Sequence, residues 1–198
     1  MAKAFKNSKE QAFYIKSKKT KKGNTTYYMT KKLDNECLDE EPVGFEVFER
    51  PDSRTLFIRR RKPNKFGLKG LNYIKKELEK NKAISDFKVD VNGDIVKIYT
   101  TDLESGADNV FGGGLRDLLF NNAQVDIFRK AFQRYEERMR IKIVERKDEK
   151  EYLVYRYCYR GSVDDWIVID AGEDLGQLAK DNLKLIGTEA YFERYRIR

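Results

Sequence analysis

Apolar and polar residues alternate along several short stretches of the chain, a period of two that is typical of β-strands. In three places two such stretches flank turn-forming residues: the sequence KKGN, the tripeptide Pro51-Asp52-Ser53 and the dipeptide Asn92-Gly93. The pattern therefore predicts three β-hairpins, which join residues 13–16 to 25–31, 44–50 to 54–62, and 87–91 to 94–100.

Other stretches carry apolar residues at a spacing of three and four, which is typical of a helix with one buried face. Asn64 and Asn122 could cap the first two of these helices, and Gly187 could end the third. The pattern predicts helices over residues 65–82, 123–139 and 174–183.

Together these elements predict an α+β fold of mostly antiparallel sheets, built from hairpins with about three packed helices. Residues 44–101 would form a ββαββ subunit. Residues 102–198 would hold the second helix, an antiparallel meander and the C-terminal helix. The strands of that meander are expected at residues 140–146, 151–160 and 165–170. We therefore expect one globular domain over residues 44–198.

The first 43 residues differ from the rest in composition. Residues 1–24 are dominated by lysine and contain too few apolar side chains to order themselves alone, so we expect a flexible basic arm. This arm could pair one short strand with its neighbour. Residues 33–43 are acidic and show no period, which predicts a linker that could also lie back over the basic surface.

Charge is distributed unevenly along the chain. The net charge is +8 overall, yet residues 1–33 sum to +9, residues 34–50 to −6 and residues 51–82 to +8. The remaining residues sum to −3. Such polarisation is typical of contact with polyanions, although a solvated tail plus one charged helix would produce it too.

Composition also limits the chemistry. The chain has no histidine, which excludes the usual imidazole base and zinc sites with imidazole ligands. Cys37 and Cys158 have no partner cysteine at metal-ligand spacing, so we expect reduced structural thiols and no cofactor. No apolar run approaches the roughly 18 residues that cross a bilayer. We expect a soluble cytoplasmic protein without membrane contact, or a nuclear one in a nucleated host, because KKTK resembles a short import signal.

One candidate site lies where a predicted strand leads into a helix. Its guanidinium and ammonium groups could grip phosphates. Alternatively, strand alternation would place one pair of these side chains opposite Glu46 and Glu49 as ordinary ion pairs. The candidate phosphate-binding residues are Arg59, Arg60, Arg61, Lys62 and Lys65.

The basic arm supplies a second set of candidates, flanked by Tyr14 and Tyr27. Flexible lysines can neutralise phosphates while aromatic rings stack on unpaired bases. A tail that only aids solubility is the alternative. The candidate residues are Lys16, Lys18, Lys19, Lys21 and Lys22.

A row of three tyrosines forms the third candidate. Strand alternation places Tyr155, Tyr157 and Tyr159 on one sheet face, where they could form a stacking platform for single-stranded nucleic acid. We favour a core interpretation instead, because period-two aromatic rows commonly pack under a helix. Phe128, Phe132 and Tyr135 of the second predicted helix would cover them.

Two remaining features are less specific. Glu145 and Lys147 resemble half of a metal-dependent nuclease pattern, for which Asp117 or Asp126 would have to supply a second carboxylate. A solvated hairpin end explains both residues without catalysis. The glycines at 112–114 lack the lysine that follows in a phosphate-binding loop, and we interpret them as a turn-permitting loop.

The sequence therefore favours a protein that binds DNA or RNA through phosphate contacts, with no catalytic residue and no metal. An interaction module for an acidic protein partner is the alternative, and a metal-dependent nuclease is a distant third hypothesis. No motif is specific enough to assign a family, and nothing in the sequence sets the oligomeric state.

Overall fold

The computed structural model describes residues 2–102, 134–146 and 149–194, and divides the chain into two compact units. The N-terminal unit comprises Met1–Lys62 and the C-terminal unit Pro63–Arg198. The strands pair antiparallel, and the described residues include three helices. The predicted α+β class with mostly antiparallel sheets is confirmed.

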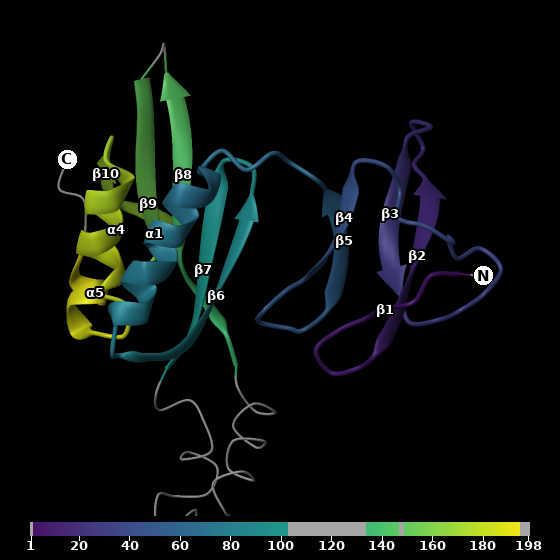
Figure 1. The fold of residues 1–198 in the computed structure, drawn as a ribbon, viewed down its shortest axis with the longest axis horizontal. Coiled ribbons are helices and arrows are strands. Elements are labelled where there is room, and N and C mark those ends of the chain that lie inside the picture. Colours follow the sequence, from purple (N-terminus) through teal and green to yellow (C-terminus); the bar gives the residue numbers. More distant parts are fainter. Residues whose placement is uncertain (1, 103–133, 147–148, 195–198) are drawn as a thin grey trace, which may run out of the picture. The chain divides into compact units, whose positions relative to one another are not determined.

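The N-terminal unit is built from two small sheets (Figure 1). The first sheet has the strand order β1-β2-β3, and the second consists of β4 and β5. The strands are β1 (Phe5–Lys6), β2 (Ala12–Lys19), β3 (Thr25–Thr30), β4 (Phe45–Glu49) and β5 (Leu56–Arg60).

The flexible arm expected at the N-terminus is not confirmed, because strands form there. The hairpin of β2 and β3 is the predicted one, and in it Phe13 and Ile15 are buried. Their burial depends on residues further along the chain. Cys37 and Leu56 are also buried in this unit, and the Leu38 N–H donates to the carbonyl of Ile15 at 2.9 Å. The first 24 residues alone lack that apolar cover, which is why composition suggested disorder.

The hairpin predicted around Pro51 forms as β4 and β5, with Glu49 opposite Leu56. It does not join the sheet expected for residues 44–101. The two predicted hairpins of that stretch belong to different sheets, and the chain divides between Lys62 and Pro63. Turn chemistry fixes a hairpin locally, whereas its sheet partners are set by contacts distant in sequence.

The C-terminal unit is a five-stranded antiparallel sheet with the order β10-β9-β8-β7-β6. Figure 1 shows α1 and α4 on one face of this sheet. The strands are β6 (Ile84–Asn92), β7 (Ile95–Asp102), β8 (Glu136–Arg146), β9 (Glu149–Arg160) and β10 (Val163–Gly172). The helices are α1 (Gly67–Lys80), α4 (Leu175–Leu183) and α5 (Glu189–Glu193).

The core of the C-terminal unit lies between these helices and the sheet. It includes apolar residues of α1 and α4 together with alternate residues of the central strands. Burying this apolar area is the main favourable contribution to folding. Fully buried members are Ile74, Leu78, Ala179, Leu183, Val96, Ile98, Met139, Ile141 and Val154.

Helix ends largely follow the sequence. The Asn64 side chain accepts a hydrogen bond from the Phe66 N–H at 2.9 Å, although α1 begins only at Gly67. Asp174 caps α4 by accepting from the N–H groups of Gly176 and Gln177. The described part of the chain contains no helix long and apolar enough to cross a membrane.

Two local predictions need correction. The helix predicted over residues 123–139 cannot extend to its expected end, because Glu136–Met139 belong to β8. Residues 123–133 lie outside the described residues. Met139 fits a helical stripe, but it also alternates with Ile141 and Ile143, and pairing with β7 selects the strand. In the third hairpin Asn92 pairs with Ile95, so the turn is Gly93-Asp94.

Candidate nucleic-acid interface

Most of the positive charge resides in the N-terminal unit. Residues 1–62 contain sixteen lysines and arginines against nine aspartates and glutamates, a net charge of +7 out of +8. Seven of these bases gather in two clusters that we call the basic end. The basic end comprises Lys18, Lys19, Lys21 and Lys22 around the β2–β3 turn, and Arg60, Arg61 and Lys62 after β5.

The two clusters lie at the same end of the N-terminal unit (Figure 1). Lys18 pairs with Thr26, next to Tyr27 on β3. The Tyr27 ring packs edge-on against Phe45 with a centroid distance of 4.8 Å. Phe45 in turn pairs with Arg60, whose guanidinium lies 5.4 Å from the Phe45 ring centroid. Two stretches that are 40 residues apart in sequence thus form one basic surface.

The lysines of the basic end are exposed side chains. Among the described residues, no ion pair engages Lys18, Lys19, Lys21 or Lys22. Ammonium groups that are not held by carboxylates can meet an external anion without breaking an internal contact. Tyr27 is half-buried, and its ring packs against Phe45.

Strand alternation separates the arginines as the sequence suggested. Arg59 donates to Glu46 at 2.8 Å and lies 4.1 Å from the Phe48 ring centroid. The Arg61 guanidinium lies 3.9 Å from the same carboxylate, whereas Arg60 points to the other side. Arg59 is therefore a cross-strand partner of Glu46 and contributes little to the exposed surface.

Lys16 is separated from the other predicted lysines by its surroundings. It is buried and donates to Asp34 and Glu36 of the acidic segment. The hydrogen bond to Asp34 raises the pKa of Lys16, and the same bond lowers the pKa of Asp34. Both groups stay charged at neutral pH. The acidic segment thus folds back onto β2 and neutralises one lysine.

Breaking this ion pair should loosen the acidic segment around Cys37. Cys37 is buried, and its sulfur lies 3.6 Å from Asp34 Oδ1. We expect a Lys16→Gln variant to be alkylated by a maleimide at Cys37 about tenfold faster than the wild type, because local opening exposes the thiol. Buried Cys158 in the C-terminal unit is the internal control in the same mass-spectrometric measurement. Equal acceleration at both thiols would contradict the prediction.

Lys65 belongs to the C-terminal unit, whereas the other members of its predicted cluster belong to the N-terminal unit. Its ammonium donates to Glu145 at 2.8 Å, and this bond raises the pKa of Lys65. Glu145 is therefore engaged as an ion-pair partner. Lys147, Asp117, Asp126 and the glycines at 112–114 lie outside the described residues. Within the described ranges, no group of three or more acidic or thiol side chains is arranged to hold a metal ion.

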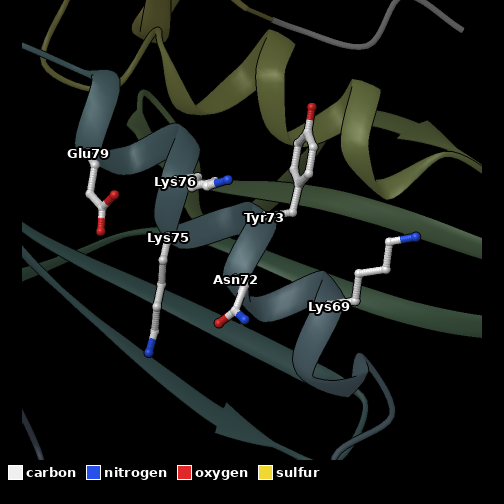
Figure 2. Close-up of a pocket in the computed structure, with 6 residues that line it drawn as sticks. All are labelled: Lys69, Asn72, Tyr73, Lys75, Lys76 and Glu79. Carbon is white, nitrogen blue, oxygen red and sulfur yellow. The ribbon is translucent and has the colours of Figure 1, made fainter.

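The exposed face of α1 is a second basic surface (Figure 2). Six residues of this helix line a hollow of about 710 Å³. Figure 2 shows Tyr73 and Lys69 on one side of the helix and Lys75 and Glu79 on another. Because one helix supplies all lining residues, the hollow is an open surface and not an enclosed cavity. The lining residues are Lys69, Asn72, Tyr73, Lys75, Lys76 and Glu79.

Tyr157 and Tyr159 lie outside the core of the described residues, contrary to the core interpretation, while Phe128 and Phe132, their expected cover, lie outside the described residues. Tyr157 is 42% exposed and Tyr159 is 82% exposed, while Val154 and Cys158 on the other face of β9 are buried. Arg156 shares the face of Val154 and Cys158, where it is 2% exposed and donates to the carbonyls of Phe192 and Arg194.

Sequence reasoning also missed two residues beside the tyrosines. Trp166 of β10 pairs with Tyr157, and the Arg140 guanidinium of β8 lies 3.7 Å from the Trp166 ring centroid. The signal that could have revealed them was the alternation of β8 and β10, read together with that of β9.

Comparisons with known proteins give no relative of this chain. No protein-family model matches it, and neither a curated protein nor a solved structure matches it. The functional argument therefore rests on the residues and the geometry described above.

Proposed function

We propose that this protein binds nucleic acid, and that the basic end of the N-terminal unit supplies its main phosphate contacts. The observation that carries the proposal is the meeting of two sequence-distant clusters of exposed bases at one end of a 62-residue unit of net charge +7. Random placement of surface charge for solubility would not require the two clusters to meet.

The geometry favours phosphates over base edges as the contacted groups. The lysines lie around a hairpin turn, and lysine is a flexible point charge that neutralises phosphate without reading a base pattern. Arg60 adds a guanidinium group that can form two parallel hydrogen bonds to one phosphate. We therefore propose weak sequence preference and no cofactor.

The lysines of α1 support the same proposal in the C-terminal unit. Lys69, Lys75 and Lys76 are exposed, whereas Lys80 donates to Glu77 at 2.6 Å. A second surface of this kind lets each unit contact phosphates by itself, which increases affinity through linkage of the two units.

Titration of a fluorescently labelled 20-nucleotide DNA, as single strand and as duplex, tests the proposal. Neutralising four to seven phosphates predicts that duplex affinity falls about 150-fold to 6,000-fold between about 50 and 200 mM salt. Fluorescence anisotropy measures this directly. Absence of binding at about 50 mM salt to DNA and to RNA would overturn the proposal. Binding that is insensitive to salt would contradict phosphate contacts.

An acidic protein partner is the competing function, and the same titration separates the two. A protein interface buries apolar area and keeps most of its affinity at high salt. Binding through phosphate contacts loses most of its affinity at high salt, because the nucleic acid retains its counterions there.

A further inference from the structure

We propose that the outer face of β9 and β10 binds unpaired bases, so that the nucleic acid recognised by this protein is single-stranded. This inference rests on the proposed function and adds a second, chemically different surface to it. We call the surface the aromatic face, and it comprises Tyr155, Tyr157, Tyr159 and Trp166.

The direction of the rings follows from the pleat of the sheet. In β9 the side chains of Tyr152 and Val154 are buried on the face that α1 and α4 cover, and Cys158 at the same strand period is also buried. Residues at odd positions therefore point away from the helices. Tyr159 is 82% exposed there. An aromatic side chain so close to full exposure contributes little to folding of the isolated chain, which favours a binding role.

Neighbouring contacts hold the inner rings in place. Tyr157 and Trp166 face each other across β9 and β10, with centroids 5.6 Å apart and an interplanar angle of 71°. The Tyr157 hydroxyl donates to Asp164, and this hydrogen bond raises the pKa of Tyr157. Tyr157 is therefore a neutral ring of fixed orientation. Fixed rings lose little conformational entropy when a ligand stacks on them.

Arg140 completes the aromatic face from the next strand. Its register partner on β9 is Tyr155, yet its guanidinium lies 3.7 Å from the Trp166 ring centroid. The Arg140 side chain thus extends from β8 across β9 to reach β10. A guanidinium plane offers a stacking surface for a base.

The charge balance indicates bases as the contacted groups on this face. Lys97, Arg140 and Lys142 face outward on β7 and β8, but Glu137 binds Arg140 and lies 3.8 Å from Lys97. Asp164 adds a second carboxylate beside the rings. Because the charges nearly cancel, phosphate attraction is weak here, and the exposed π surfaces are what a ligand can use.

Single strands fit this surface and duplexes do not. In a duplex the base faces are stacked on one another, so a protein ring cannot reach them without paying for unstacking. An unpaired strand can turn each base onto a ring, and every base has a π face. The basic end would attract either form, while the aromatic face would retain the single strand.

Tyr159 is the residue to change, because its side chain is mostly exposed and its loss should leave the fold intact. We expect Tyr159→Ala to lower the affinity of the full chain for a 20-nucleotide oligothymidylate at least fivefold, with duplex affinity unchanged. Tyr159→Phe keeps the ring and should retain wild-type affinity within about twofold. Tyr159→Leu keeps apolar bulk without a flat π face and should behave like Tyr159→Ala. Trp166 is the single tryptophan, so its emission should change when oligothymidylate binds.

The outcomes distinguish this inference from the proposed function. Three results together would overturn the inference and leave the proposed function standing. They are equal affinity for single strands and duplexes, wild-type affinity of Tyr159→Ala, and unchanged Trp166 emission. If Tyr159→Leu binds as tightly as wild type, stacking is excluded. If the wild type is a dimer that Tyr159→Ala dissociates, a second copy covers the rings. If no probe binds at low salt, the proposed function and this inference fail together.

Discussion

A variant that replaces Lys18, Lys19, Lys21 and Lys22 with glutamine should bind duplex DNA about 100-fold or more weakly than the wild type at about 50 mM salt. Each lost phosphate contact removes its share of counterion release, close to tenfold at this salt concentration, so the loss of two contacts already gives about 100-fold. The slope of log affinity against log salt should also become less steep by up to about 3.6. Fluorescence anisotropy at several salt concentrations gives both quantities.

The matched control removes the same charge from the opposite end of the unit. Lys6, Lys9, Lys31 and Lys32 are exposed, and β2 separates them from the basic end by about 16 Å or more. That separation exceeds the Debye length at about 50 mM salt, so their replacement with glutamine should cost less than about fivefold. Equal losses in the two variants would show that net charge alone governs binding and would refute a localised interface.

Replacement of Gly187 by alanine should destabilise the C-terminal unit by about 3 kcal/mol. Gly187 has φ of +85°, a left-handed conformation that costs other residues about 1–2 kcal/mol. A Cβ atom there would also lie 3.0 Å from Ala83 Cβ and 3.1 Å from the Ala83 carbonyl oxygen. This backbone cannot retreat easily, because Asn81 donates to the carbonyls of Leu183 and Ile186 at 2.9 Å.

Gly161 is the control for Gly187, because alanine there would meet the same backbone strain without a steric clash. It has φ of +62° in the turn between β9 and β10, and an added Cβ would meet no heavy atom within 4 Å. We expect Gly161→Ala to cost only about 1–2 kcal/mol, the strain alone. Urea denaturation followed by Trp166 fluorescence reports on this unit directly. Equal losses at the two glycines would mean that the contact with Ala83 contributes nothing.

The aromatic row shows where sequence reasoning reaches its limit. Alternation correctly placed Tyr155, Tyr157 and Tyr159 on one face, because side chains in a strand point to opposite sides at a period of two. It could not decide which face the helices cover. The face that contains Arg156 is the covered one, and carbonyl acceptors near the C-terminus satisfy its guanidinium inside the protein.

In the candidate interface, too, the sequence predicts some features and leaves others to the tertiary structure. The lysines around the β2–β3 turn could be identified from composition, and the arginine alternation from the strand period. The pairing of Lys16 with Asp34 could not, because the two residues are 18 positions apart and meet only when the acidic segment folds back. The ion pair of Lys65 with Glu145 spans 80 positions. Contacts at such separations leave no local pattern in the sequence.

The sequence by itself determined the α+β class, three hairpins, the helices that begin near residues 65 and 174, and the concentration of positive charge in the first part of the chain. Each depends on interactions between residues that are near in sequence, such as turns, caps and apolar periodicity. Tertiary structure alone decided the division at Lys62, the meeting of the two basic clusters and the exposure of Tyr159. These depend on which apolar faces cover one another, a choice made by packing between distant segments.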